Sequence, residues 1–272
     1  IAPYIKNKLV DPAVLSVDEG GNFVIPLLSG HIGGANGFAK VLAKVIKATP
    51  VVTTATDVNK LFAVDEWAAR NNMIINSMKA AKDFAAALVD GQEVGLFTDY
   101  PIISALPRQI VLKDKGVTGL AITKNRNVNP FDLTVQLWPR NIYLGIGCRR
   151  GTTLESIETL VLPKLKELGI DLRTIVGVAS VDLKKDEAGL LNFAAKYNWE
   201  ISFFTAEELQ NAAGEFSSSD FVKSVVGVSN VCERSAVLAA NNGSIISSKC
   251  SLNGVTLAVA EADIVLDFEK LS

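Results

Sequence analysis

The sequence predicts an α/β protein, in which short apolar strands alternate with amphipathic helices. The first sign is a β-prone run over residues 23–28, followed by apolar residues at helical spacing from Phe38 to Ile46. The second sign is the same alternation after Pro139, with clearer helix caps. We therefore expect α/β modules over 1–76 and 139–272, with a small middle segment of different texture over 77–138.

The elements of the first half follow from apolar runs separated by Gly, Pro and Asp. Strands are expected over 23–28, 51–54, 94–98, 109–112 and 119–123. Helices are expected around 38–46, over 58–71 and over 78–89, the first with its large apolar side chains facing the core. Residues 125–139, rich in Asn and Pro, are interpreted as a loop that crosses into the last module.

The second half carries stronger local signals. Strands are expected over 142–146 and 175–181, and Asn253-Gly254 between two alternating runs predicts a hairpin. Helices are expected after the caps Thr152/Glu155, Thr205/Glu208 and Asn230/Glu233, and over 186–197. Gly169 suits the end of the first of these helices, and Pro163 should kink or shorten it.

Composition excludes several classes of partner. A net charge of −2 with scattered Lys and Arg gives no basic surface for nucleic acid. Every apolar stretch is interrupted before the roughly 18 residues of a membrane span, so no membrane partner is expected. The 3 cysteines form no C-x-x-C pair, which argues against a disulfide framework and a zinc site and favours a reducing cytoplasm. The start at Ile1 predicts that earlier residues are missing and the first module is incomplete.

The single His of the chain, His31, lies in a glycine-rich corner between the strand 23–28 and the helix that follows. Such a corner presents backbone N–H groups and a positive helix end, which suit an anionic ligand. Its candidate ligand-binding residues are Ser29, Gly33, Gly34 and Asn36. An imidazole can act as a general base near neutral pH, but a lone His is also often only structural.

The segment after the second expected strand could support His31. Asp57 could orient the imidazole or a water, and its alternative, which we favour, is an ordinary helix N-cap. Thr54 and Thr56 are further candidates for ligand binding on this segment. A Ser29 nucleophile is not expected, because the pattern is not G-x-S-x-G.

A second strand-to-helix corner spans residues 144–152. Its spacing, G-x-G-x-x-x-G, departs from the dinucleotide fingerprint, so NAD binding is rejected. What remains is a glycine turn with adjacent Arg149 and Arg150, a group that recognises carboxylates or phosphates, and only one of the two arginines is expected to contact a ligand. The candidate ligand-binding residues of this corner are Gly147, Arg149, Arg150 and Thr152, with Asp182 and Lys184 from the next strand end, for which a solvated loop is the alternative. Cys148 is expected to be a packing residue.

These residues also carry a family resemblance that covers nearly the whole chain. The string DPAVLSVDEGGNFVIPLLSGHIGGANGFAKVLAKVIKATPVVTTATDVNKLFAVDEWA resembles the N-terminal module of cobalamin biosynthesis protein G (CbiG), the cobalt-precorrin-5A hydrolase family. GIGCRRGTTLESIE, VGVASVDLKKDEAGLLNFAAKYN, FFTAEEL and GVSNVCERSAVLAA resemble its C-terminal domain. The segment between them corresponds to the family's variable middle.

The resemblance implies opening of the δ-lactone of cobalt-precorrin-5A in anaerobic vitamin B12 synthesis, with C20 released as acetaldehyde to give cobalt-precorrin-5B. It implies a tetrapyrrole substrate that brings its own cobalt, no cofactor of the protein, and His31 as base or as axial cobalt ligand. The hydrolytic chemistry is expected in the N-terminal module, with the C-terminal module holding the substrate. The sequence leaves open a homodimer, a non-catalytic tetrapyrrole carrier and, more weakly, a nucleotide-binding enzyme.

Overall fold

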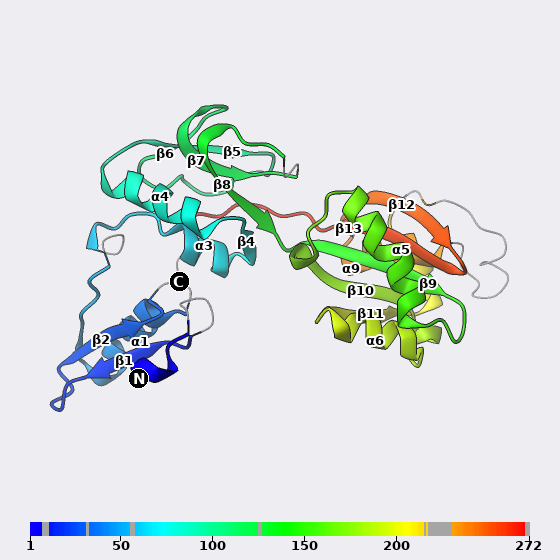
Figure 1. Cartoon of the computed structure of the whole chain (residues 1–272), viewed down its shortest axis with the longest axis horizontal. Helices are drawn as coiled ribbons and strands as arrows, with labels where there is room; N and C mark the ends of the chain where they lie inside the picture. Colours follow the sequence, from blue (N-terminus) through cyan, green and yellow to red (C-terminus); the bar gives the residue numbers. More distant parts are fainter. Residues whose placement is uncertain are drawn as a thin grey trace. The chain divides into compact units, whose positions relative to one another are not determined.

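The chain forms two units that are described separately. The computed structural model describes residues 1–6, 11–30, 33–54, 58–124, 127–214, 216 and 230–269. Unit 1 contains Ile1–Pro139 together with Val265–Ser272, and unit 2 contains Arg140–Ile264 (Figure 1). The chain therefore leaves unit 1 after Pro139 and returns to it at Val265.

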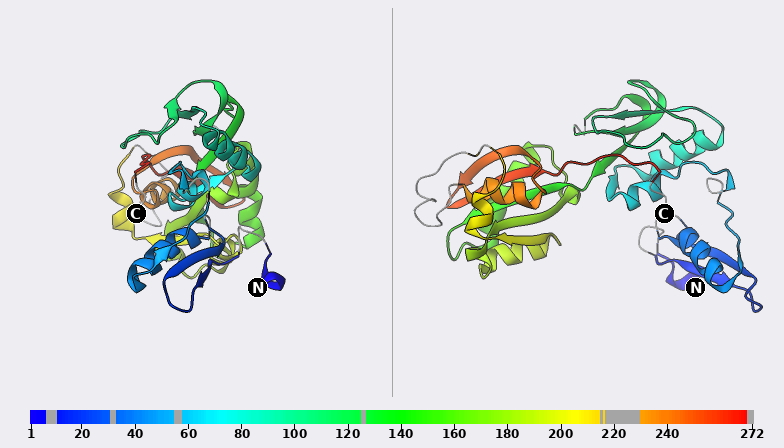
Figure 2. Two further views of the ribbon diagram at one scale, coloured as in Figure 1. Left: turned by 90° about the vertical axis from the view of Figure 1, so that its left-hand side faces the viewer. Right: turned by 180° about the vertical axis from the view of Figure 1, so that it is seen from behind.

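Unit 1 begins with a short 3-10 turn, η1 (Ala2–Tyr4), and a small sheet with the order β1-β2-β3. The strands are β1 (Val14–Val17), β2 (Phe23–Leu28) and β3 (Thr49–Pro50), and β2 runs antiparallel to β1 and parallel to β3. The expected strand over 51–54 is wrong, because the residues that pair with β2 are Thr49 and Pro50. Helix α1 (Ala35–Ile46) packs on this sheet (Figures 1 and 2).

The inward face of α1 is not the one that the large apolar residues predict. Ala35, Ala39 and Ala43 are fully buried, and the last two pack with Val24 of β2. Phe38, Val41, Val45 and Ile46 are instead exposed by 55%, 60%, 73% and 40%. Small side chains let the helix approach the narrow sheet closely, so the alanine stripe faces inward and the large apolar stripe faces outward.

The rest of unit 1 is a five-stranded sheet with the order β4-β8-β7-β5-β6. Its strands are β4 (Met73–Ile75), β5 (Val94–Thr98), β6 (Ile110–Leu112), β7 (Gly116–Ile122) and β8 (Phe131–Pro139). The loop expected over 125–139 is therefore wrong for most of its length, because β8 is an interior strand paired with β7 and β4. The described residues of this part include α3 (Val64–Arg70), much shorter than the expected 58–71, and α4 (Met78–Val89), as expected.

Unit 2 is an α/β domain built on one sheet with the order β11-β10-β9-β13-β12. Its strands are β9 (Ile142–Cys148), β10 (Ile175–Val181), β11 (Glu200–Phe204), β12 (Ser244–Leu252) and β13 (Val255–Glu261). The first three are parallel, and β13 pairs antiparallel with β9 and β12. The expected hairpin is confirmed, since Asn253 and Gly254 join β12 to β13 with φ values of 49° and 84°.

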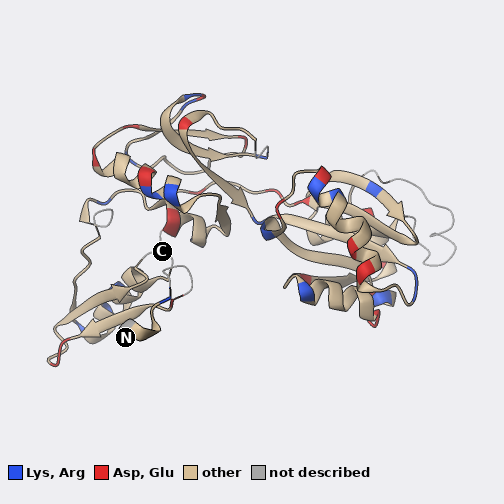
Figure 3. Cartoon of the chain, viewed as in Figure 1, with Lys and Arg blue, Asp and Glu red and all other residues tan. Residues whose placement is uncertain are grey.

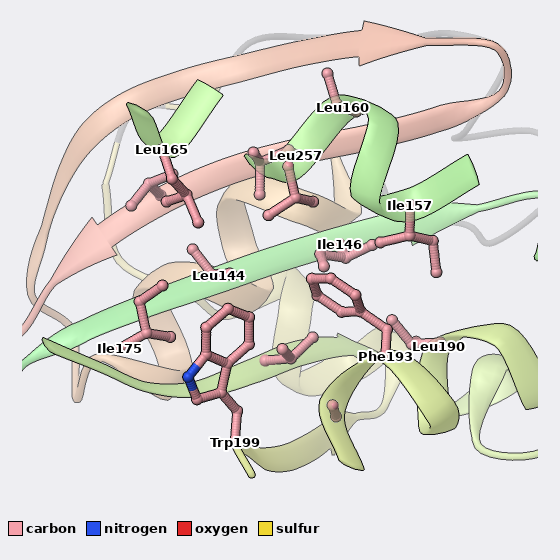
Figure 4. Packing of buried hydrophobic residues seen from close by; sticks show 14 of the residues in the cluster. Leu144, Ile146, Ile157, Leu160, Leu165, Ile175, Leu190, Phe193, Trp199 and Leu257 are labelled. Atoms are coloured by element: carbon pink, nitrogen blue, oxygen red, sulfur yellow. The ribbon is translucent and has the colours of Figure 1, made fainter. Parts of the chain in front are cut away.

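Helices cover both faces of the unit 2 sheet. Among the described residues of this unit, the helical segments are α5 (Leu154–Glu167), η2 (Leu172–Thr174), η3 (Asp182–Lys184), α6 (Ala188–Lys196), α7 (Ala206–Gln210) and α9 (Val231–Ala239). Side chains of α5 and α6, such as Ile157 and Phe193, point to the same core as Leu144 and Leu257 of the sheet (Figure 4). Cys232 and Ala236 of α9 pack with Ala258 on the other face.

The helix caps of unit 2 confirm some local predictions and correct others. Thr205 and Glu208 form a full capping box, and Asn230 caps α9 by accepting from the N–H of Glu233. The N-cap of α5 is Thr153 rather than Thr152, and α5 continues through Pro163. Gly169 follows the end of α5 with φ of 67°, as expected.

The surface carries a mixture of charges. Lys and Arg alternate with Asp and Glu along the ribbon of each unit rather than gathering by sign (Figure 3). Among the described helices, none is both long and apolar enough to cross a membrane. The α/β prediction is thus confirmed in both units.

Candidate functional site

The structure describes the first corner up to Gly30 and again from Gly33, on either side of the predicted catalytic residue. His31, Thr56 and Asp57 lie outside the described residues, so their predicted roles stay predictions. The flanking residues show how the corner is built. Ser29 directly follows β2 and has a left-handed φ of 57°, and Gly34 is the N-cap of α1 with φ of 77°.

Tight packing explains the small residues of this corner. A Cβ on Gly33 would lie 2.2 Å from the Ser29 Cβ, and one on Gly30 would lie 2.8 Å from Asn36 Oδ1. The Ser29 hydroxyl donates to the backbone carbonyl of Asp11 at 2.8 Å. Gly30 and Gly33 are therefore needed for close packing within the corner, and Ser29 has a structural partner, which agrees with the expectation that it is no nucleophile.

Asn36 joins the corner to the segment that precedes Asp57. Its side chain is 2% exposed and its Nδ2 donates to the Thr54 hydroxyl at 3.0 Å. Its backbone N–H donates to the carbonyl of Gly30 at 2.9 Å. The structure thus brings together the segments that lead to His31 and Asp57, and it places Asn36 as the internal connection between them.

The second corner, Gly147–Thr152, lies at the carboxyl ends of β9 and β10, where the Ser180 hydroxyl donates to the Ile146 carbonyl at 2.7 Å. The backbone N–H of Arg149 donates to the Gly254 carbonyl at 3.2 Å, which ties the corner to the β12–β13 hairpin. The Thr152 hydroxyl donates to the Arg149 carbonyl at 2.8 Å. Thr152 therefore stabilises the turn internally.

Part of the glycine pattern at this corner is also explained by packing. A Cβ on Gly145 would lie 1.8 Å from the Cys232 carbonyl oxygen, so Gly145 lets α9 contact the sheet backbone. A Cβ on Gly147 would lie 2.6 Å from the Thr256 hydroxyl. The first two glycines of the G-x-G pattern are accounted for by these contacts without a nucleotide.

The two adjacent arginines differ in their partners. Arg150 Nη1 contacts Asp186 Oδ1 at 2.7 Å, and its Nη2 donates to the Leu183 carbonyl at 3.3 Å. The stem of Arg149 instead lies across Gly254, where an added Cβ would meet its Cδ at 2.8 Å. Both arginines are exposed, so their partners are what distinguishes them. Arg149 is thus the arginine better placed to meet an incoming anion.

Glu187 is a member of the second corner that the sequence analysis missed. Its side chain is 5% exposed, and Oε1 accepts from the Gly151 N–H at 2.8 Å. Oε2 is buried without a hydrogen bond, and the ammonium of Lys184 lies 3.5 Å from it. Lys184 is thereby joined to the corner, whereas Asp182 lies half-buried at the start of η3. In the sequence, Glu187 follows Asp186 just before a helix. A Glu in that position is usually solvated, so nothing in the sequence indicates that this side chain is buried.

Cys148 borders the same group of charges. Burial raises the pKa of its thiol, and the nearby Lys184 ammonium partly opposes that rise. A thiol with a raised pKa is a poor nucleophile near neutral pH, which agrees with the predicted packing role. The second corner therefore presents the exposed cationic side chains of Arg149 and Arg150 rather than a reactive thiol.

Within the part of the chain that the structure describes, no group of three or more His, Cys, Asp and Glu side chains could hold a metal ion.

Comparison with known proteins decides the family. The model "Cobalamin synthesis G N-terminal" matches residues 1–57, "Cobalamin biosynthesis central region" matches 62–139 and "Cobalamin synthesis G C-terminus" matches 142–260. A cobalt-precorrin-5A hydrolase from Priestia megaterium is 32% identical over 96% of this chain and 74% of its own length. The chain belongs to the CbiG family.

Two further relatives accompany this assignment. A cobalt-precorrin-5A hydrolase from Salmonella typhimurium is 34% identical to this chain, over 96% of this chain and 78% of its own length. Among solved structures, a cobalamin biosynthesis protein G homologue from Sulfolobus solfataricus is 25% identical, with a TM-score of 0.40 over 96% of this chain and 78% of that one.

Proposed function

We propose that this CbiG chain is a cobalt-precorrin-5A hydrolase of anaerobic cobalamin biosynthesis. The observation that carries the proposal is its 32% and 34% identity, over 96% of the chain, to two relatives that bear that name. The tetrapyrrole is the partner, it supplies the cobalt, and the protein itself needs no cofactor. The three free thiols fit a reducing cytoplasm.

The reaction would begin with water. A general base removes a proton from the water, whose oxygen adds to the lactone carbonyl, and the ring C–O bond breaks to leave a carboxylate and an alcohol on C20. Loss of the alcohol proton then forms the C=O of acetaldehyde while the bond between C20 and the macrocycle breaks. The electron pair of that carbon–carbon bond stays on the macrocycle, which takes up a proton to give cobalt-precorrin-5B.

The two corners supply different parts of this chemistry. We assign the base to His31, oriented by Asp57, with Ser29, Gly33, Gly34, Asn36, Thr54 and Thr56 shaping the first corner. The Asn36–Thr54 hydrogen bond supports this assignment, because it joins the two segments that carry the proposed catalytic residues. The second corner, formed by Gly147, Arg149, Arg150, Thr152, Asp182 and Lys184, holds an anionic group of the substrate on Arg149.

The test is an anaerobic assay with cobalt-precorrin-5A, in which a coupled dehydrogenase measures acetaldehyde. We expect release by the parent protein and a loss of at least about a hundredfold in kcat for His31→Ala, the usual size of a general-base contribution. Lys44→Gln, on the exposed surface of α1, is the matched control and should keep the parent rate.

The other outcomes are equally informative. Equal release by the parent and His31→Ala would keep the hydrolase but remove His31 from the mechanism. If neither protein releases acetaldehyde but both bind the tetrapyrrole tightly, the protein is a tetrapyrrole carrier and not a hydrolase.

A further inference from the structure

Unit 1 contains a pocket of about 750 Å³ that the sequence analysis did not anticipate. It lies between α1, the segment that leads into α3, the loop before β6 and the returning C-terminal segment. Its volume falls in the usual range of small-molecule sites. The walls combine apolar surface with several cationic side chains. This combination suits a ligand that has an apolar body and acid groups.

One wall of the pocket is formed by buried aromatic rings. The rings of Trp67 and Phe268 stack with centroids 4.7 Å apart and planes 7° apart, and Phe62 lies 5.8 Å from each. Leu61 and Leu106 extend the apolar surface. A ligand that enters must therefore present a large apolar body.

The rim of the pocket carries more positive than negative charge. Lys40, Lys60, Arg70 and Arg108 line it, against the two carboxylates Glu66 and Glu269. Arg70 and Glu66 form an ion pair with each other. Lys60 and Arg108 are exposed and come from two separate segments of the wall, so their positive charges can attract carboxylate groups.

The pocket borders the first corner. Gly37, in the first turn of α1, lines the pocket, and Asn36 beside it holds the Thr54 hydroxyl. Lys60 follows Asp57 by three positions in the sequence, and Gly37 follows His31 by six. An apolar ligand with acid groups held in this pocket would therefore lie next to the segments that lead to the proposed catalytic residues.

We propose that this pocket binds an edge of a carboxylate-bearing tetrapyrrole, with its apolar ring toward the aromatic wall and its acid groups on Lys60 and Arg108. The identity of the ligand rests on the proposed function, but the chemistry of the pocket stands separately. The pocket adds residues to the substrate site that neither corner contains. It also gives unit 1 a direct part in holding the substrate.

Binding is tested with uroporphyrin III, an octacarboxylate tetrapyrrole, by quenching of tryptophan fluorescence and by calorimetry. The variant Lys60→Gln/Arg108→Gln should raise the Kd by on the order of tenfold to a hundredfold, as expected for the loss of two charge-assisted contacts. Lys79→Gln/Lys82→Gln on α4 removes the same charge from exposed positions outside the pocket. This control should change the Kd less than twofold, and circular dichroism verifies that both variants fold.

Equal weakening in the two double variants would show a general charge effect and overturn the proposal. An unchanged Kd in Lys60→Gln/Arg108→Gln, or no binding of uroporphyrin III by the parent protein, would overturn it as well.

The acetaldehyde assay separates this proposal from the proposed function. Release by the parent, with the same KM in Lys60→Gln/Arg108→Gln, would keep the hydrolase and reject the pocket. If the parent protein releases no acetaldehyde but the double variant alone loses uroporphyrin binding, the pocket proposal stands and the hydrolase proposal is rejected.

Discussion

The indole N–H of Trp67 donates to the backbone carbonyl of Asp267 at 3.0 Å, so a helix early in unit 1 holds the returning end of the chain. The N–H of Phe268 donates to the Ser104 hydroxyl at 2.7 Å, and Leu266 forms a bridge with Ile102. These contacts make the segment after unit 2 an integral part of unit 1. Its side chains complete the core next to the pocket.

Phe268→Ala is expected to destabilise unit 1 by about 3–5 kcal/mol, the usual cost of deleting a buried aromatic ring. Phe268 is 3% exposed and stacks on Trp67, so its loss leaves a cavity against the indole. Hydrogen exchange of α3 amides measures the effect within unit 1. Val265→Ala, at a side chain 52% exposed, should leave the exchange within about 0.5 kcal/mol of the parent. Equal protection of α3 in both variants would show that the ring contributes little.

Arg149→Gln is expected to raise the KM for cobalt-precorrin-5A more than Arg150→Gln does. The guanidinium of Arg150 already contacts Asp186 and Leu183, whereas the stem of Arg149 lies on Gly254. Loss of one charge-assisted contact corresponds to on the order of a tenfold rise in KM. Steady-state kinetics of the two variants give the comparison directly. A larger rise for Arg150→Gln would place the anion on the other arginine.

The stability of the protein should fall above pH 9 partly because of Cys232. Burial raises the pKa of this thiol from 9.0 to about 11. Between pH 9 and pH 11 the thiol of the unfolded chain loses its proton while that of the folded chain keeps it. The free energy of unfolding therefore falls as pH rises. The loss amounts to about 1.4 kcal/mol by pH 10.

Urea unfolding at pH 8 and pH 10, under reducing conditions, tests this expectation against Cys232→Ala. The difference in unfolding free energy between the two pH values should be smaller in the variant by about 1.4 kcal/mol. The other two thiols are present in both proteins, so they cancel in the comparison. An identical pH dependence would contradict the raised pKa of Cys232.

Local signals in the sequence predicted unit 2 well because several of its elements are marked by a cap or a turn. Thr205 with Glu208 and Asn253 with Gly254 act within a few residues, and the structure confirms both. The same reasoning failed for α1, where the alanine stripe and the stripe of Phe38 and Val41 are both apolar at helical spacing. Only the closeness of helix and sheet decides which of them faces inward, and that distance is a tertiary property.

Strand β8 was missed for a related reason. The Asn and Pro residues before Phe131 suggested a loop, while the alternation of Phe131, Leu133, Val135 and Leu137 was the better signal for a strand. Glu187 could not have been found from the sequence, because its role depends on the N–H of Gly151 on another segment. His31 and Asp57 were singled out from the sequence and remain predictions.

The return of the chain to unit 1 at Val265 sets an order for folding during synthesis. All of unit 2, Arg140–Ile264, leaves the ribosome before the residues that cover Trp67. Unit 2 can therefore complete its core on the nascent chain, whereas the core of unit 1 beside Trp67 stays open until Phe268 has been made. Premature termination after unit 2 would therefore release a product in which unit 2 is complete but Trp67 of unit 1 lacks the stacked ring of Phe268.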